Sequence, residues 1–337
     1  MAGPATPPLI EVDGLGVRLN TRSGPAQAVR GVGFALKRGE TLGLVGESGC
    51  GKSVTALSLM GLLPDSAVVG GSIRFDGREL VGLADRDYCK LRGNRISMIF
   101  QEPMTALNPM HTIGRQVAEP LWRHAGCSAA DARKQAVALL DRVGLPDAAK
   151  RVDAYPHQFS GGQRQRVTIA MALACQPDVL IADEPTTALD VTIQRQILDL
   201  IADLVAERGM SMILISHDLG VIGENVQRMM VMYGGTVVES GPTAAVFTRM
   251  GHPYTQGLFR ARPRLGAKKG TRLKTIAGTV PELADLPKGC AFADRCALVE
   301  DRCRAALPEA IEVAPRHRVR CLRTDVSMAD AVGVLPA

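Results

Sequence analysis

The segment Gly46-Glu47-Ser48-Gly49-Cys50-Gly51-Lys52-Ser53 is the stretch whose residue types and spacing most directly predict chemistry. It fits G-x-x-x-x-G-K-[ST], the P-loop pattern, between a strand-like run at 41–45 and a helix-like run that begins at Val54. Glycines let successive backbone N–H groups face a phosphate, Lys52 reaches the terminal phosphates, and Ser53 ligates Mg²⁺. We therefore predict that residues 46–54 bind a nucleoside triphosphate; a plain glycine-rich turn is the alternative.

Two carboxylates follow a second apolar run. Phosphoryl transfer needs a metal carboxylate and a group that activates water, and Asp183 and Glu184 come directly after the strand-like residues 179–182. We expect Asp183 to hold Mg²⁺ through water and Glu184 to act as the general base. An acidic turn after a strand is the plain alternative.

Four further segments resemble the remaining motifs of ATP-binding-cassette (ABC) ATPases, in the same order along the chain. Phe159-Ser160-Gly161-Gly162-Gln163 resembles the LSGGQ signature with Phe in place of Leu, Gln101 the Q-loop glutamine, Ala188-Leu189-Asp190 the D-loop, and His217 the switch histidine. Taken singly, Gln101 fits a loop amide, Asp190 a helix N-cap and His217 a strand-end histidine. Taken together, the six motifs are all explained by resemblance to one family, the ABC ATPases.

The resemblance implies how these residues act. In that family two cassettes stack head to tail, and each ATP lies between the P-loop of one and the signature of the other. Ser160, Gly161, Gly162 and Gln163, with Asp190, are therefore expected to complete the ATP site of a partner, while Gln101 acts as a sensor and Mg²⁺ ligand and His217 contacts the γ-phosphate. One cassette per chain implies a second ABC ATPase subunit, with a heterodimer preferred to a homodimer.

A narrower resemblance rests on residues 100–109, 183–192 and 252–255, which look like the dipeptide, oligopeptide and nickel importer ATPases. It implies a transport-coupled ATPase (translocase) on the cytoplasmic face of the cell inner membrane, bound to two transmembrane permease subunits and served by an extracytoplasmic peptide-binding protein. Dipeptide and oligopeptide are preferred as substrates to nickel and glutathione. The family usually stacks adenine on an aromatic residue upstream of the P-loop, but this chain has Val17-Arg18-Leu19-Asn20 there.

Four of the eight cysteines, Cys290, Cys296, Cys303 and Cys321, gather after a basic linker. A reducing cytoplasm disfavours a disulfide framework, and the spacings of five, six and seventeen residues lack the close pairs of structural zinc sites. We predict one [4Fe–4S] cluster, with zinc or four free thiols as alternatives. The resemblance to D-type peptide-importer subunits implies the same cluster.

Cys50 lies inside the P-loop at the expected mouth of a helix. The helix dipole and Lys52 favour a thiolate there, which predicts that maleimide inactivates the protein and that Mg-ATP protects it. A small filler residue is the alternative.

The chain as a whole fits an α/β P-loop NTPase core with an antiparallel β subdomain, a helical subdomain at 112–143 and a small C-terminal cysteine-cluster extension. We divide it into an ABC nucleotide-binding domain at 8–256 and an importer-type extension at 257–330. Its 337 residues carry a net charge of +6 but only 4% aromatic residues, which favours anionic lipid nearby over nucleic acid as a partner. No window predicts a membrane span, and the first residues do not resemble a signal peptide. A soluble cassette acting on nucleic acid is the rival function.

Overall fold

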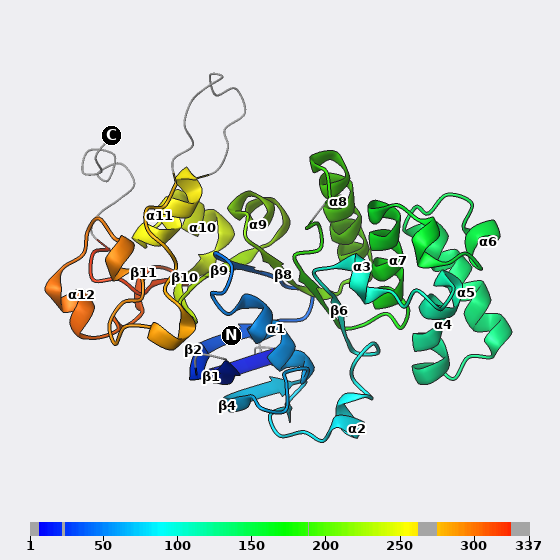
Figure 1. Ribbon diagram of the computed structural model, residues 1–337, viewed down its shortest axis with the longest axis horizontal. Coiled ribbons are helices and arrows are strands. Elements are labelled where there is room, and N and C mark those ends of the chain that lie inside the picture. Colours follow the sequence, from blue (N-terminus) through cyan, green and yellow to red (C-terminus); the bar gives the residue numbers. More distant parts are fainter. Residues whose placement is uncertain (1–6, 22–23, 188, 262–274, 325–337) are drawn as a thin grey trace, which may run out of the picture. The chain divides into compact units, whose positions relative to one another are not determined.

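The structure is a computed structural model that describes residues 7–21, 24–187, 189–261 and 275–324. The chain divides into two compact units built from segments distant in sequence. One, called here the signature unit, comprises Met1–Leu9, Leu36–Glu40 and Gly82–Ile215; the other, called here the P-loop unit, comprises Ile10–Ala35, Thr41–Val81 and Ser216–Ala337. Figure 1 colours the chain along its sequence, and each unit is described separately below.

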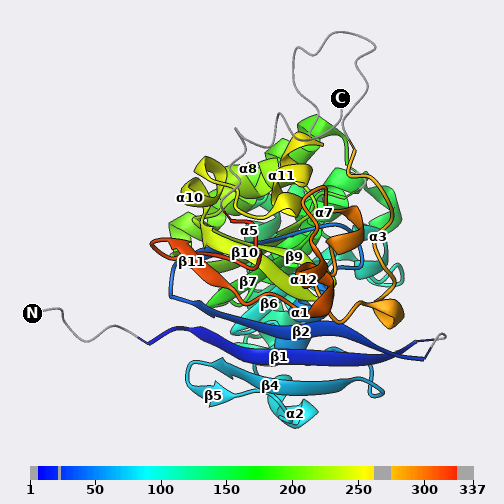
Figure 2. The same cartoon turned by 90° about the vertical axis from the view of Figure 1, so that its left-hand side faces the viewer.

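The P-loop unit contains a four-stranded sheet in the order β2-β1-β4-β5. Its strands are β1 (Ile10–Thr21), β2 (Gly24–Leu36), β4 (Val68–Phe75) and β5 (Arg78–Glu79). Strand β4 pairs antiparallel with both β1 and β5, and Figure 2 shows β1, β2 and β4 side by side as blue arrows. This confirms the predicted antiparallel subdomain, whose strands alternate buried and exposed residues because a half-exposed sheet tolerates polar residues on one face.

A second set of strands in this unit carries the P-loop. Its order is β11-β12-β10-β9-β3, with β3 parallel to β9 and the later pairs antiparallel. The strands are β3 (Thr41–Val45), β9 (Arg228–Tyr233), β10 (Thr236–Pro242), β11 (Ile311–Ala314) and β12 (His317–Val319). The predicted strand at 41–45 is present, whereas the C-terminal strands were not predicted. They extend the sheet, so strand pairing also holds the extension in place.

Short helices complete the P-loop unit. They are α1 (Lys52–Met60), α9 (Leu219–Asn225), α10 (Thr243–Thr248), α11 (Pro253–Arg260) and α12 (Asp301–Ala305), with 3-10 turns η2 (Leu283–Asp285) and η3 (Ala293–Arg295). Helix α1 begins two residues before the predicted Val54, and Gly61, with φ 59°, ends it.

The signature unit contains three parallel strands in the order β8-β7-β6 and most of the long helices. The strands are β6 (Ile96–Ile99), β7 (Val179–Asp183) and β8 (Ser211–Ser216). The helices are α2 (Asp85–Tyr88), α3 (Pro103–Ala106), α4 (Ile113–His124), α5 (Ala129–Arg142), α6 (Ala148–Arg151), η1 (Pro156–Gln158), α7 (Gly161–Leu173) and α8 (Val191–Arg208). Strands buried along their whole length are typical of a parallel sheet covered on both faces.

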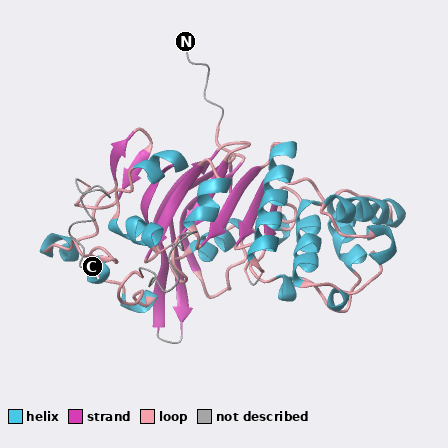
Figure 3. Ribbon diagram, turned by 90° about the horizontal axis from the view of Figure 1, so that it is seen from above, coloured by secondary structure: helices cyan, strands magenta, loops and turns pink. Residues whose placement is uncertain are grey.

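The predicted helical stretch at 112–143 is two helices, α4 and α5, because Ser128 caps a new helix by accepting the Asp131 N–H. Figure 1 shows α4 to α7 together, in colours from blue-green to green, and this group consists of helices and loops when coloured by type in Figure 3. Among the described residues, no helix is long and apolar enough to cross a membrane.

A buried polar cluster joins the C-terminal strands to α11 in the P-loop unit. Glu239 on β10 accepts the N–H groups of Gly251 and His252 at 2.8 and 3.0 Å, and its Oε1 lies 2.8 Å from Nε2 of His317 on β12. Nδ1 of His252 accepts the Tyr254 N–H and so caps α11. Burial lowers the pKa of His252 to about 4, although Glu239 opposes this.

The depressed His252 pKa predicts acid destabilisation of the fold. Below the unfolded-state pKa of 6.5 the unfolded chain binds the additional proton, so stability falls between pH 6.5 and about 4. The loss approaches roughly 3 kcal/mol, at 1.36 kcal/mol per pKa unit. His252→Asn keeps a side-chain cap but cannot titrate. Urea unfolding at several pH values should show that the free energy of unfolding falls less steeply with decreasing pH in this variant. His157→Asn, at an exposed site, is the control, and equal slopes in wild type and His252→Asn would refute the assignment.

Candidate nucleotide-binding site

The P-loop joins β3 to α1 and lies very close to neighbouring backbone. Gly46 and Gly51 have φ values of 155° and 102°. A Cβ on Gly46 would lie 2.3 Å from the Met232 carbonyl oxygen, and one on Gly51 would lie 2.7 Å from that of Ala28. These two positions therefore require glycine, both for backbone conformation and for space.

Lys52, the first residue of α1, is held within this loop. Its Nζ donates to the carbonyl oxygens of Gly46 at 2.7 Å and Glu47 at 3.1 Å, and the residue is only 5% exposed. A fixed ammonium beside a loop of backbone N–H groups at a helix N-terminus has the composition of an anion site. Ser53 follows it in α1 and is partly exposed.

The structure corrects the prediction of a reactive Cys50 thiolate. Cys50 is fully buried, and desolvation raises its pKa; Lys52, whose Nζ lies 3.9 Å from Sγ, lowers it by less. Burial outweighs the nearby cation because removing the thiolate from water costs more than one partly shared ammonium returns. Cys50 is therefore a small buried residue, as the alternative proposed.

Maleimide should consequently label Cys50 slowly. In a chain whose only cysteine is Cys50, we expect a labelling rate at pH 7.5 about tenfold or more below that of a matched chain retaining only the exposed Cys89, because the thiolate fraction and access are both reduced. Mass spectrometry over time gives both rates. Faster labelling at Cys50 than at Cys89 would restore the thiolate interpretation.

In the signature unit, Gln101 and Glu184 are in hydrogen-bond contact. Asp183 ends β7 and is 4% exposed. Glu184 follows it with φ 44°, a left-handed conformation that is costly for a non-glycine residue and is common at functional sites. Its N–H donates to the Ile215 carbonyl at 3.0 Å, and its Oε2 accepts from Nε2 of Gln101 at 3.4 Å and from Oγ1 of Thr187 at 3.1 Å. These contacts orient the carboxylate.

The signature residues form the N-terminus of α7. Ser160 is the N-cap, and its Oγ accepts the Gln163 N–H at 3.4 Å while Oε1 of Gln163 accepts the Ser160 N–H at 3.2 Å. This capping box fixes the first turn. A Cβ on Gly162 would lie 2.9 Å from Ile193 of α8, so α8 packs closely against the signature.

Asp190 has the helix-capping role that was the alternative to its D-loop role, and His217 lies next to a helix cap. Asp190 is the N-cap of α8 and accepts the Ile193 N–H at 3.0 Å; Ala188 of the same motif lies outside the described residues. His217 is exposed, follows β8 and precedes Asp218, which caps α9. The P-loop and His217 thus belong to the P-loop unit, and the other predicted ATP-site residues belong to the signature unit.

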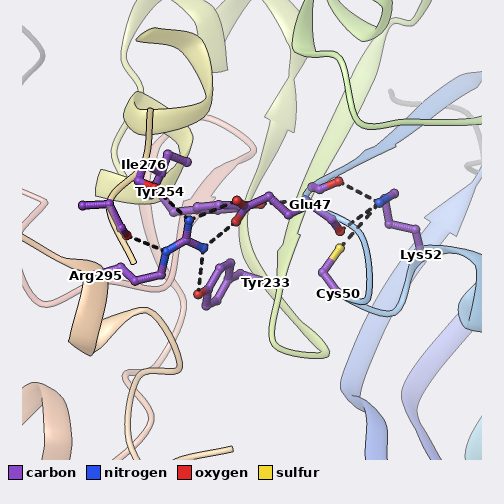
Figure 4. Close-up of polar contacts among 9 residues, drawn as sticks. Glu47, Cys50, Lys52, Tyr233, Tyr254, Ile276 and Arg295 are labelled. Carbon is purple, nitrogen blue, oxygen red and sulfur yellow. Dashed lines mark hydrogen bonds and ion pairs between the residues drawn. The ribbon is translucent and has the colours of Figure 1, made fainter. Parts of the chain in front are cut away.

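The residues that hold Glu47 were not predicted from the sequence. Its carboxylate forms a two-point ion pair with Arg295, and its N–H donates to the Tyr254 hydroxyl at 2.8 Å, as Figure 4 shows. Tyr254 belongs to the segment His252-Pro253-Tyr254-Thr255, which was noted only for its resemblance to importers. That segment was the signal for Tyr254, whereas no pattern indicated Arg295.

The four C-terminal cysteines line one pocket of the P-loop unit, together with Phe292 and Leu298. Burial raises the pKa of Cys290 and Cys296, and raises that of Cys321 to about 11. Within the described ranges, no three His, Cys, Asp or Glu side chains are arranged to hold a metal ion. The structure thus brings the cysteines to one place without confirming the iron–sulfur or the zinc assignment.

Comparison with known proteins decides the family. Residues 29–187 match the family described as ABC transporter, and residues 238–303 match the oligopeptide/dipeptide transporter C-terminal region. A peptide import ATP-binding protein of Brucella abortus (strain 2308) is 51% identical over 328 residues, which cover 94% of this chain and 97% of the relative. The chain belongs to the ABC transporter family. It is an ATP-binding, ATP-hydrolysing subunit of the peptide-import group.

Other relatives agree. The oligopeptide transport ATP-binding protein OppD of Mycobacterium tuberculosis is 48% identical over 322 residues, covering 95% of this chain and 52% of that protein. A dimeric MJ0796 cassette bound to ADP and Pi has a TM-score of 0.62 at 28% identity and covers 69% of this chain and 98% of that chain. The cbiO1 structure from Clostridium perfringens scores 0.60 at 27% identity, covering 72% and 92% respectively. These structures confirm the α/β cassette fold; the domain boundary at 256/257 and the individual residue roles stay predictions.

Proposed function

We propose that this ABC subunit hydrolyses ATP on the cytoplasmic face of the membrane to drive import of dipeptides or oligopeptides. The match of residues 238–303 to the oligopeptide/dipeptide transporter C-terminal region carries this proposal, since it separates the chain from cassettes in general. Substrate choice belongs to two permease subunits and an extracytoplasmic binding protein. Nickel and glutathione are the alternative cargoes.

Each catalytic role rests on local chemistry. Lys52 and the loop N–H groups bind phosphates, Glu184 activates the attacking water, and His217 contacts the γ-phosphate. Ser53, Asp183 and Gln101 supply the hard oxygen ligands that suit Mg²⁺, which neutralises phosphate charge when bound. The buried Asp183 and the oriented Glu184 support this division of roles.

A partner cassette completes the site. The signature capping box leaves Ser160 and Gly161 exposed at the start of a 13-residue helix, whose N–H groups and dipole suit a γ-phosphate from another subunit. The MJ0796 cassette is described as a dimer with ADP and Pi. We therefore propose a dimer with a second ABC ATPase subunit, related or identical.

The segment after Gln101 is proposed to contact a permease. Gln116 on α4 holds it by accepting the Asn108 N–H at 2.8 Å and donating to the carbonyls of Asn108 and His111 at 3.0 and 2.9 Å. Met110, within this braced turn, is 79% exposed. A rigid turn with an exposed apolar side chain suits a protein interface.

Substitutions at Glu184 and Lys52 separate catalysis from binding. Glu184→Gln should keep ATP affinity and reduce turnover of the assembled importer by about a hundredfold or more, because the amide cannot accept a proton. Lys52→Ala should instead lose ATP affinity. Equilibrium nucleotide binding and steady-state phosphate release measure the two effects, and near-normal turnover in Glu184→Gln would remove it as the base.

We also propose that Cys290, Cys296, Cys303 and Cys321 hold one [4Fe–4S] cluster. The four thiols line one pocket and are the ligand type from which iron–sulfur sites are built. They would have to move closer together to bind a cluster, because no three of the described His, Cys, Asp or Glu side chains are placed to hold a metal ion. The raised pKa values mean that binding would release protons from these thiols. When bound, the cluster would cross-link four positions within residues 290–321 of the C-terminal extension.

Cys296→Ser tests the cluster. Protein purified without oxygen should be brown, with about four irons per chain, and this variant should lose colour and iron while retaining nucleotide binding. Cys89→Ser, at an exposed site outside the pocket, is the matched control. Colourless protein with stoichiometric zinc would overturn the cluster and leave the ATPase assignment standing.

A further inference from the structure

Arg295, in the C-terminal extension, donates hydrogen bonds from all three guanidinium nitrogens to other residues of the P-loop unit. Its Nη1 and Nη2 donate to the two Glu47 carboxylate oxygens at 2.7 and 3.0 Å, and Nη1 also donates to the Tyr233 hydroxyl at 3.2 Å. Nε donates to the Ala277 carbonyl at 2.9 Å and Nη2 to that of Ile276 at 3.3 Å. The side chain is 5% exposed. A planar guanidinium held at this many points fixes its carboxylate in distance and angle.

The backbone of Glu47 is held as well. Its N–H donates to the hydroxyl of Tyr254, which is fully buried. The Tyr254 ring packs against Tyr233 and Phe292, with centroids 4.6 and 5.3 Å away. The tyrosine is therefore a rigid anchor. Because it takes the Glu47 N–H, the N–H groups left for phosphate are those further along the loop.

Glu47 in turn contacts the lysine of the loop, because its carbonyl oxygen accepts from Lys52 Nζ at 3.1 Å. Figure 4 shows this row of contacts from Arg295 through Glu47 to Lys52. Displacing Glu47 would move a carbonyl that sets the position of the ammonium.

From this geometry we propose that Arg295 and Tyr254 clamp Glu47 and thereby position the P-loop for nucleotide, which makes the C-terminal extension a working part of the ATP site. Arg295 is a positioning residue that acts through Glu47. A purely stabilising ion pair is the competing explanation, but a buried ion pair adds little net stability once desolvation is counted. The two explanations differ in what they predict for nucleotide affinity. The inference rests on the proposed function, in which the P-loop binds ATP.

The test measures binding of a fluorescent ATP analogue, N-methylanthraniloyl-ATP with Mg²⁺, to the purified full-length chain. Arg295→Met should weaken binding by about tenfold, at the lower end of what a hydrogen bond between charged groups contributes. Arg295→Lys, which keeps the charge but not the two-point geometry, should recover part of the loss. In the assembled importer, KM for ATP should rise while kcat changes by less than about twofold, since Glu184 is untouched.

A double-mutant cycle separates the clamp from general destabilisation. Glu47→Gln alone should weaken binding as Arg295→Met does, and the double variant should bind no more weakly than the poorer single variant. Arg304→Met is the matched control, because Arg304 lies in the same extension and pairs with Asp294, on the surface. This control should retain wild-type affinity.

Three results would overturn the clamp: Arg295→Met binding within twofold of wild type, losses that multiply in the double variant, or an equal loss in Arg304→Met. If Arg295→Met does not fold, as judged by thermal unfolding without nucleotide, Arg295→Lys and Glu47→Gln decide by the same criteria. Lys52→Ala distinguishes failure of the clamp from failure of the proposed ATP-binding role of the P-loop. If it weakens binding and the clamp variants do not, only the clamp fails; if it has no effect, the proposed role of the P-loop fails and the clamp with it.

Discussion

The structure depends on holding one short glycine-rich loop rigid while leaving most of its N–H groups available to a ligand. The interior of a helix or sheet cannot do this, because its N–H groups are already paired. The chain solves the problem by surrounding the loop with distant segments: backbone carbonyls at Ala28 and Met232 lie against its glycines, and Tyr254 and Arg295 hold Glu47. The P-loop is held rigid by these neighbouring segments, so residues outside the ATP motifs also determine the geometry of the site.

The residues that bind and hydrolyse ATP could be predicted from the sequence more completely than the residues that hold them in position. The P-loop, Asp183-Glu184 and the signature were recognisable because phosphate binding demands particular residues at fixed spacing, and the predicted strand at 41–45 is present. By contrast, β9 was missed since its Arg-Met-Met-Val-Met-Tyr sequence has few of the β-branched residues typical of strands. Arg295 gave no local signal, because its partner lies far away along the chain and no spacing rule connects them.

Cys50 shows why local rules fail inside a packed loop. A helix mouth and a neighbouring lysine both favour a thiolate, and both are present. Burial is a property of the whole fold, however, and desolvation outweighs them here. The same dependence on context gives Asp190 a capping role that sequence alone could not separate from a nucleotide-binding one.

The contact between Glu47 and Arg295 joins positions 248 residues apart. During synthesis at about 5–20 residues per second, the P-loop is therefore made roughly 12 to 50 seconds before the arginine that clamps it. A growing or truncated chain presents the loop without its clamp. With the proposed clamp, the ATP site reaches its full affinity only once the C-terminal extension has been translated and folded, so tight nucleotide binding reports that the extension is in place.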